Sequence, residues 1–352
     1  MKRYILTFIV IVLYFGGLNN VRELGDLAIV KAVSIDLNDE GKYEISAIII
    51  DTKEKENKDK GLLISSVGNS VHEAARNMVD VSSKKLYIAH MESLIISEKI
   101  AREDLENTLD FFIRDNEGSN SFFLFIAKDA KAEECLEKIN EEEIDLVPFL
   151  KSTQKYKGNA NIKSLNDVVK IFLEKGSSLC VNTISLEDNI KINNMAYFKN
   201  YEVMGYLSEN ESITYNLVIN EVDNILESVG EENSLVIVEI VEPKTKVNVK
   251  DCNVTIDVKG VAHITQTGKN ITLDDIQEKE NIEMMINNKI GDEIYSLFDN
   301  KRKAEVDIFG IGNLLYRKKN ILYNNENYLD SINLLVNVDI DIVNTGGIKK
   351  AW

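Results

Sequence analysis

Histidine, cysteine and proline are scarce in this chain, and their scarcity limits the chemistry that it can carry. There are three histidines, three cysteines and two prolines among 352 residues. Cys135, Cys180 and Cys252 lie far apart with no CxxC pair, so the sequence predicts neither a disulfide framework nor a zinc site. We expect each cysteine to be a small buried hydrophobe rather than a nucleophile.

Enzyme motifs are also missing. His72 and Glu73 lack the second histidine of an HExxH helix, and no GxSxG elbow is present. Gly310 and Gly312 in FGIGN have no phosphate-loop context, so we interpret them as turn and packing glycines. The acidic run over 141–145 is interpreted as a solvated helix start. The sequence therefore predicts no catalytic, cofactor-binding or metal-binding residue.

The sharpest candidate for polar chemistry is the pair His90 and Glu92 in AHMES. On a strand, residues two apart point to the same side, so this pair could share a divalent metal or a proton. Two ligands do not make a metal site. We prefer a structural interpretation, with a half-buried, hydrogen-bonded histidine beside a surface glutamate.

Positive charge is in deficit. Lys and Arg total 41 against 58 Asp and Glu, which gives a formal charge of −17. Such a surface repels polyanions and so disfavours nucleic acid as a partner. The hydrophobic fraction of 44% and the charged fraction of 28% are those of a globular protein. The length allows two or three domains.

The N-terminus carries a long apolar run. Lys2 and Arg3 precede apolar residues over 4–15, and two glycines follow, as in an export signal. The run is shorter than the roughly 20 residues that span a bilayer, which favours a signal peptide over an anchor. A lipoprotein signal needs a cysteine next, but Leu18 stands there. We assign 1–18 as a signal or membrane-anchor segment.

The body alternates helical and strand patterns, which is typical of an α/β or α+β domain. A hairpin is predicted over 27–50 around Asn-Asp-Glu-Gly, and a strand over LYIAHMESLIIS. Two amphipathic helices are predicted in the first half. Their apolar faces are Val71, Ala74, Ala75 and Met78 in one helix, and Leu105, Leu109, Phe112 and Ile113 in the other.

The later segments predict a small middle unit and a sheet with one long helix. The middle unit has a turn at Asn200 and a helix that begins near Ser208, with Glu211 completing a capping box. Alternating runs from Ser234 indicate an antiparallel sheet, with Pro243 at a strand end. A helix over 273–298 should lie across this sheet. Its apolar face is Ile276, Ile282, Met285, Ile286, Ile290, Ile294 and Leu297.

Several stretches in order resemble the Ger(x)C proteins, the C subunits of bacterial spore germinant receptors. The resemblance begins at RELGDLAIVKAVSIDLNDEGKYEISAIII and covers nearly the whole chain. It continues through SVHEAARNM, KKLYIAHMESLIISEKIARE, LDFFIRDNEGSNSFFLFIAKDAKAEECLE, MAYFKNYEVMGYLSENES, DIFGIGNLLYRKKN and VNVDIDIVNTGGI.

The resemblance implies a non-enzymatic subunit on the outer, extracytoplasmic face of the spore inner membrane, needed for nutrient-triggered germination. It would act beside the A-type and B-type membrane subunits of the receptor. The implied fold is α+β, a three-domain mixed α/β body with largely antiparallel sheets after the N-terminal segment. We expect an N-terminal α/β domain over 19–178, a small middle domain over 179–230 and a C-terminal α+β domain over 231–352.

The N-terminus departs from the family pattern. When Arg22 and Glu23 are aligned with the family start, Leu18 occupies the position of the lipidated cysteine and Asn19 that of a tryptophan. We therefore expect either an uncleaved anchor over 5–18 or a cleaved chain held by its partners. The alternatives are a membrane-anchored solute-binding or sensor protein with a pocket between its domains, and a secreted hydrolase that uses His90 and Glu92.

Overall fold

The fold is described from a computed structural model of the chain. The described residues are 27–50, 61–114, 120–192, 194–231, 234–268, 276–319, 321–324 and 327–344. The predicted signal or anchor over 1–18, with Leu18, lies outside them, as does most of the charged loop that follows the hairpin. No helix in these described ranges is long and apolar enough to cross a bilayer.

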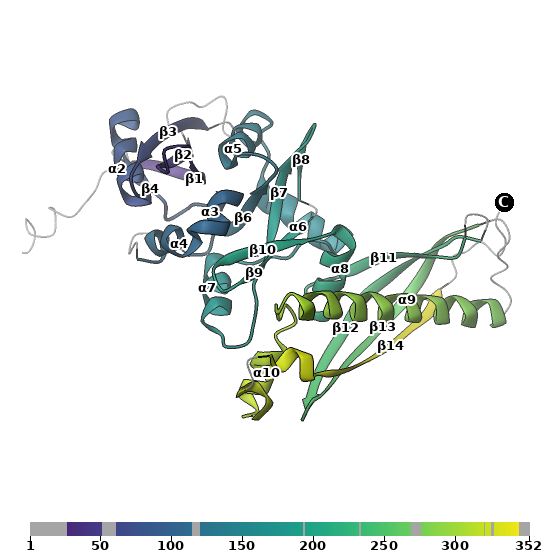
Figure 1. Cartoon of the computed structure of the whole chain (residues 1–352). Coiled ribbons are helices and arrows are strands. Elements are labelled where there is room, and N and C mark those ends of the chain that lie inside the picture. Colours follow the sequence, from purple (N-terminus) through teal and green to yellow (C-terminus); the bar gives the residue numbers. More distant parts are fainter. Residues whose placement is uncertain are drawn as a thin grey trace, which may run out of the picture.

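The first half of the chain builds a mixed sheet in the order β10-β9-β7-β6-β5-β1-β2-β3 (Figure 1). Two short strands join it from the side, β4 on β1 and β8 on β7. Its strands are β1 (Leu27–Leu37), β2 (Tyr43–Ile50), β3 (Leu62–Gly68), β4 (Lys85–Tyr87), β5 (Ser93–Ser97), β6 (Phe123–Lys128), β7 (Cys180–Leu186), β8 (Ile190–Lys191), β9 (Met195–Lys199) and β10 (Glu202–Leu207).

The expectation of largely antiparallel sheets is wrong for the centre of this sheet. β1, β5, β6 and β7 run parallel, while the flanking pairs β1/β2, β2/β3, β7/β9 and β9/β10 are antiparallel. Helices connect the central strands, and a helical crossover returns the chain in the same direction. These strands are buried almost without interruption because helices cover both faces.

Each face of the sheet packs against its own helices. α2, α3, α4 and α7 bury their apolar sides in one core, and α5 and α6 do so in the other. The helices are α2 (Val71–Ser82), α3 (Glu98–Glu103), α4 (Leu105–Arg114), α5 (Ala132–Glu141), α6 (Leu146–Lys157) and α7 (Leu165–Leu173). The predicted faces of α2 and α4 are buried at most positions, but Ile113 is 41% exposed.

A buried asparagine network ties the loop after α6 to the strands and helix that follow. Asn161 N donates to Asn182 Oδ1 at 3.0 Å, and Asn182 Nδ2 donates to Asn161 O at 2.6 Å. Asn216, on α8 (Glu209–Val218), donates to the carbonyls of Gly158 at 2.8 Å and Ala160 at 3.1 Å. Since buried amides need partners, this network fixes where α8 packs. The capping box predicted for α8 is present.

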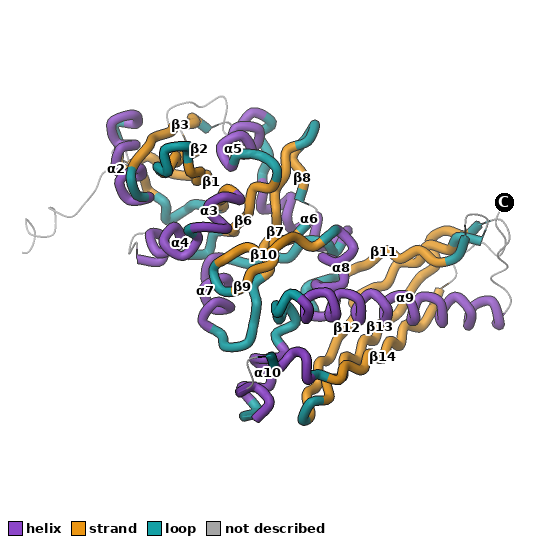
Figure 2. The backbone as a smooth tube through the Cα atoms, in the orientation of Figure 1, coloured by secondary structure: helices purple, strands orange, loops and turns teal. Residues whose placement is uncertain are grey.

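The second sheet has the order β11-β12-β13-β14, and Figure 2 shows α9 running along it. β11, β12 and β13 are antiparallel as expected, but β14 is parallel to β13 because helices connect these two strands. The elements are β11 (Asn224–Val229), β12 (Val236–Lys250), β13 (Asn253–Thr267), α9 (Ile276–Lys303), α10 (Ile311–Arg317), η2 (Ile321–Asn324), η3 (Tyr328–Ser331) and β14 (Asn333–Asn344).

Three expectations for this half need correction. Pro243 lies inside β12, not at its end, because a bulge between Val241 and Lys244 takes the residue that cannot donate to the ladder. On α9 the predicted isoleucine face is buried, but Ile276 is 74% and Met285 39% exposed. α9 packs on the sheet as predicted, since it contacts both outer strands, β11 and β14, but it runs along β14 rather than across the strands.

Side chains of α9 cap the outer edge of β14. Glu283 Oε1 accepts from Ile342 N at 2.7 Å, and Asn287 Oδ1 accepts from Ile340 N at 3.0 Å. Further along, the Tyr295 hydroxyl accepts from Val336 N at 3.0 Å. Four residues of a helix advance about 6.0 Å along its axis, and two residues of a strand advance about 6.6 Å. Side chains four residues apart on α9 therefore reach backbone N–H groups two residues apart on β14. These contacts satisfy backbone N–H groups at a sheet edge that could otherwise pair with another strand.

Replacing Asn287 with alanine should destabilise the protein. The change leaves the Ile340 N–H without its partner, and a lost partner of a largely buried donor costs about 1–3 kcal/mol. Thermal or urea unfolding measures the loss. The control is Asn288→Ala, because Asn288 is the next residue on α9 and is exposed. Equal stability of the two variants would contradict the capping role.

Candidate interaction site

A groove of about 750 Å³ opens between α2 and α4 and reaches the sheet beneath them. Ala75 and Val79 of α2 form one wall, and Phe111 of α4 forms part of the other. The floor is Val33 and Ile45, which are core residues at 3% and 2% exposure. The gap exists because α2 turns Val71, Ala74 and Met78 to the core and leaves its neighbouring face uncovered.

The rim of the groove is basic in an acidic protein. Its charged side chains are Arg76, Lys85, Asp110 and Arg114. Asp110 is neutralised by Arg114, whose Nε lies 2.6 Å from Asp110 Oδ2. Arg76 is exposed and makes no hydrogen bond or ion pair within the described part of the chain. The groove therefore combines an apolar floor with an unpaired guanidinium group at its mouth.

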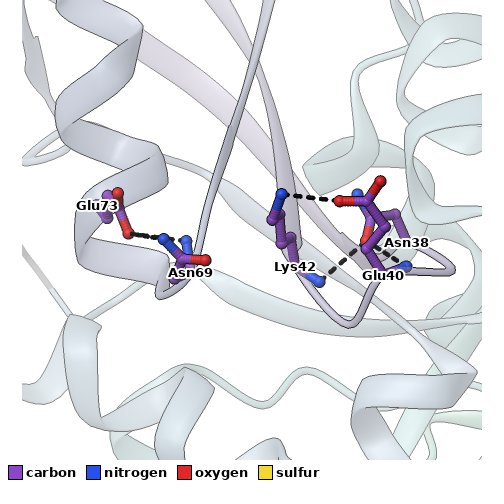
Figure 3. A network of polar contacts seen from close by, with 5 residues as sticks. All are labelled: Asn38, Glu40, Lys42, Asn69 and Glu73. Carbon is purple, nitrogen blue, oxygen red and sulfur yellow. Dashed lines mark hydrogen bonds and ion pairs between the residues drawn. The ribbon is translucent and has the colours of Figure 1, made fainter.

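Polar contacts hold the turns beside this groove (Figure 3). Asn38 Oδ1 accepts from Glu40 N at 3.0 Å and Lys42 N at 2.9 Å, which closes the β1–β2 hairpin. Glu73 Oε2 accepts from both nitrogens of Asn69, and these hydrogen bonds lower the pKa of the Glu73 carboxyl. The contacts are exposed, so they orient the turns rather than add much stability.

A buried carboxylate organises the DIFGIGN stretch. Asp307 accepts from Gly312 N at 2.6 Å, Ile311 N at 3.1 Å and the Tyr328 hydroxyl at 2.8 Å. Burial raises the pKa of Asp307 although these donors oppose the shift. A Cβ on Gly312 would fall 2.3 Å from Tyr328 Oη, and Gly310 has φ +67°. The interpretation of Gly310 and Gly312 as turn and packing glycines is confirmed.

The same stretch joins the two halves of the chain. Ser178 N donates to the Asp307 carbonyl at 2.9 Å, and Asn313 N donates to the Gly176 carbonyl at 2.8 Å. A Cβ on Gly176 would lie 2.5 Å from the carbonyl carbon of Gly312. The two backbones therefore touch directly, which only glycine permits at this distance.

Both halves match known families in sequential order. Residues 20–186 match the spore germination protein N-terminal domain, and residues 193–346 match the spore germination B3/GerAC-like C-terminal domain. The chain belongs to the GerAC family of spore germination proteins. The resemblance to Ger(x)C proteins is thereby confirmed.

Named relatives align with the chain over most of their length. Spore germination protein KC of Bacillus subtilis (strain 168) is 25% identical over 87% of this chain and 85% of its own. Spore germination protein GerQC of Bacillus cereus is 21% identical over 98% and 99%. The crystal structure of the GerBC protein superposes with a TM-score of 0.56 at 15% identity, covering 92% of this chain and 100% of its own, which shows a shared fold.

In this GerAC-family chain, the expectation that His90 and Glu92 lie on one strand is wrong. The strand pattern breaks between β4 and β5, where Met91 N donates to Ile88 O at 3.0 Å and closes a turn. His90 is exposed and packs edge-on against Tyr87 at 5.8 Å. Burial raises the pKa of Glu92. Over the described ranges, no group of three or more His, Cys, Asp or Glu side chains is placed to hold a metal.

The cysteines behave as expected at two positions of three. Cys135 and Cys180 are buried, and burial raises the pKa of each thiol to about 12. The expectation is wrong for Cys252, which is exposed because it lies in the tight turn between β12 and β13.

The acidic run after α5 is a turn into α6, where Asp145 Oδ1 accepts from Val147 N at 3.2 Å.

The groove between α2 and α4 leaves little trace in the sequence pattern. Helical periodicity sorts residues into buried and exposed faces, but the space between two helices depends on how far apart they pack. The helical pattern places Ala75 on the apolar face of α2, yet Ala75 lines the groove. The signal that pointed there was the adjacent pair Phe111 and Phe112, since one of two neighbouring aromatic residues on a helix must leave the core face.

A second groove lies between β11 and α9, and the carboxyl group of Glu293 in it has a shifted pKa. Lys289 Nζ lies 2.6 Å from Glu227 Oε2 and 3.9 Å from Glu293 Oε1. Burial, reinforced by the charge of Glu227, raises the pKa of Glu293 from 4.5 to about 7. The folded state thus binds a proton more tightly than the unfolded state between these values, so stability falls as pH rises through that window.

Glu293→Gln should therefore leave stability almost unchanged near pH 4.5 and raise the melting temperature above pH 7. The amide keeps the neutral form that the folded state prefers. Melting curves from pH 4 to 8 provide the measurement. Glu280→Gln, at an exposed position of the same helix, is the control. A parallel pH profile for Glu293→Gln and the wild type would rule out this assignment.

Proposed function

We propose that the protein is a non-enzymatic, extracytoplasmic subunit of a spore germinant receptor, needed for nutrient-triggered germination. The observation that carries the proposal is the match of both family domains, in order, over residues 20–186 and 193–346. The coverage of more than four fifths of two spore germination proteins supports it. The proposal assigns the chain a role in protein contacts rather than in chemistry.

The proposed partners are the A-type and B-type membrane subunits of the receptor, at the outer face of the spore inner membrane. The apolar run after Lys2 and Arg3 supports a membrane location, because the positive charges keep its start in the cytoplasm. The formal charge of −17 supports protein partners rather than nucleic acid.

The proposed organisation keeps three domains, over 19–178, 179–230 and 231–352, after the segment 1–18. The asparagine network beside α8 and the Asp307 joint would then be two of the contacts between these domains, beside the pairing of β6 with β7 and of β11 with β12. With Leu18 in place of a lipidated cysteine, attachment falls to the apolar segment itself or to the partner subunits.

Deleting the gene should abolish the response of spores to the nutrient of the cognate receptor. Sporulation, and germination by a trigger that bypasses nutrient receptors, should stay normal. The measurement is the loss of optical density of purified spores after nutrient addition, with complementation by the full chain as the control. Normal nutrient germination through the cognate receptor would refute the proposal.

The mature protein should carry no lipid at its N-terminus, because Leu18 offers no thiol for lipid transfer. Its first residue should be Met1 if the apolar run is kept as the anchor. Intact mass and N-terminal sequencing of protein extracted from spore membranes test this. An unlipidated start near Leu18 would instead mean a chain held by its partners alone.

A further inference from the structure

We propose that the groove between α2 and α4 binds one acyl chain of an anionic membrane phospholipid, with Arg76 contacting the phosphate. The inference goes beyond the proposed subunit role and rests on its membrane attachment. It adds a direct lipid contact from the folded body.

The shape of the groove fits a slender apolar chain. Two helices form its walls, and its floor reaches the buried side chains Val33 and Ile45 in the central sheet. At one point the walls approach closely, since the rings of His72 and Phe111 lie 5.8 Å apart. A partner helix about 10 Å wide would rest on top of such a gap, whereas an alkyl chain enters it. The volume of about 750 Å³ lies within the range of ligand sites.

The charges on the rim favour an anionic head group. Arg76, Lys85 and Arg114 are the basic side chains of the lining and Asp110 is the acidic one, and Asp110 is already paired with Arg114. Arg76 is left without a partner among the described residues. A guanidinium group binds phosphate through two parallel hydrogen bonds, so Arg76 is suited to a phosphodiester at the mouth of the groove.

The path of the chain brings this groove near the membrane. β4, which contributes Lys85 and Leu86 to the lining, pairs in parallel with the start of β1, where Leu27 lies opposite Lys85. The sequence between Leu18 and Leu27 can extend by at most about 30 Å. If the apolar segment stays in the bilayer, the groove lies within that reach of the lipid head groups. The C-terminal sheet and α9 lie at the other end of the molecule (Figure 1).

The test uses photoactivatable lipids and the full-length chain. The protein is reconstituted without its partner subunits in vesicles of phosphatidylcholine. The vesicles contain a photoactivatable probe lipid, either phosphatidylglycerol or phosphatidylcholine, and both probes carry the same diazirine-bearing acyl chain. After irradiation, mass spectrometry maps the labelled peptides. We expect phosphatidylglycerol to label α2 and α4 about fivefold more than phosphatidylcholine does, the effect of one basic side chain at an anionic surface.

Arg76→Glu should reduce phosphatidylglycerol labelling to the phosphatidylcholine level. Its matched control is Arg317→Glu on α10, since Arg317 is also exposed and lies outside the groove. Ala75→Phe, which fills the gap, should reduce labelling by both lipids. Circular dichroism checks that each variant is folded.

Labelling outside α2 and α4 only, equal labelling by the two lipids, or unchanged labelling of Arg76→Glu would each overturn the inference. Labelling by a diazirine-bearing free fatty acid but by neither phospholipid would also do so. The assay contains no other receptor subunit and does not measure germination. A negative labelling result would therefore overturn the lipid-binding inference and leave the proposed receptor role untouched.

Discussion

The buried carboxylate of Asp307 is the contact on which the arrangement of the two halves depends. The carboxylate accepts hydrogen bonds from the first turn of α10 and from the Tyr328 hydroxyl. The backbone carbonyl of Asp307 accepts from Ser178 N in the first half of the chain. A buried carboxylate without these donors would be costly, so the donors and the carboxylate require one another. The close approach of Gly176 and Gly312 follows from the same joint, because it leaves no room for a side chain.

The two sheets solve the problem of exposed edges and faces in different ways. The first is covered by helices on both faces, which allows parallel central strands with almost continuous burial. The second has one long helix, α9, which packs on it together with shorter helices such as α8 and α10. α9 also protects the β14 edge with Glu283, Asn287 and Tyr295. The groove arises in the first half, where two covering helices stand apart above the sheet.

Family membership and physical structure agree on which stretches carry the fold. DIFGIGN is a joint rather than a phosphate loop, because its glycines permit backbone contact and its aspartate caps a helix. The AHMES stretch is a turn between two strands rather than a metal site. These two stretches therefore serve architecture, whereas SVHEAARNM and LDFFIR, which also carry the likeness to germination proteins, line the groove. The groove between α2 and α4, with its apolar floor and basic rim, is a surface feature that the packing of the sheet does not require.

The sequence by itself determined the element types, most of the core faces and the family, because periodicity, capping residues and ordered motifs are local properties of the chain. Ser208 with Glu211, the hairpin before Tyr43 and the α9 isoleucines were predictable for that reason. Tertiary structure decided the parallel pairing of β1, β5, β6 and β7, the bulge at Pro243, the exposure of Cys252 and the groove itself. Each of these depends on which segments meet in space and at what separation, and no local pattern encodes that separation.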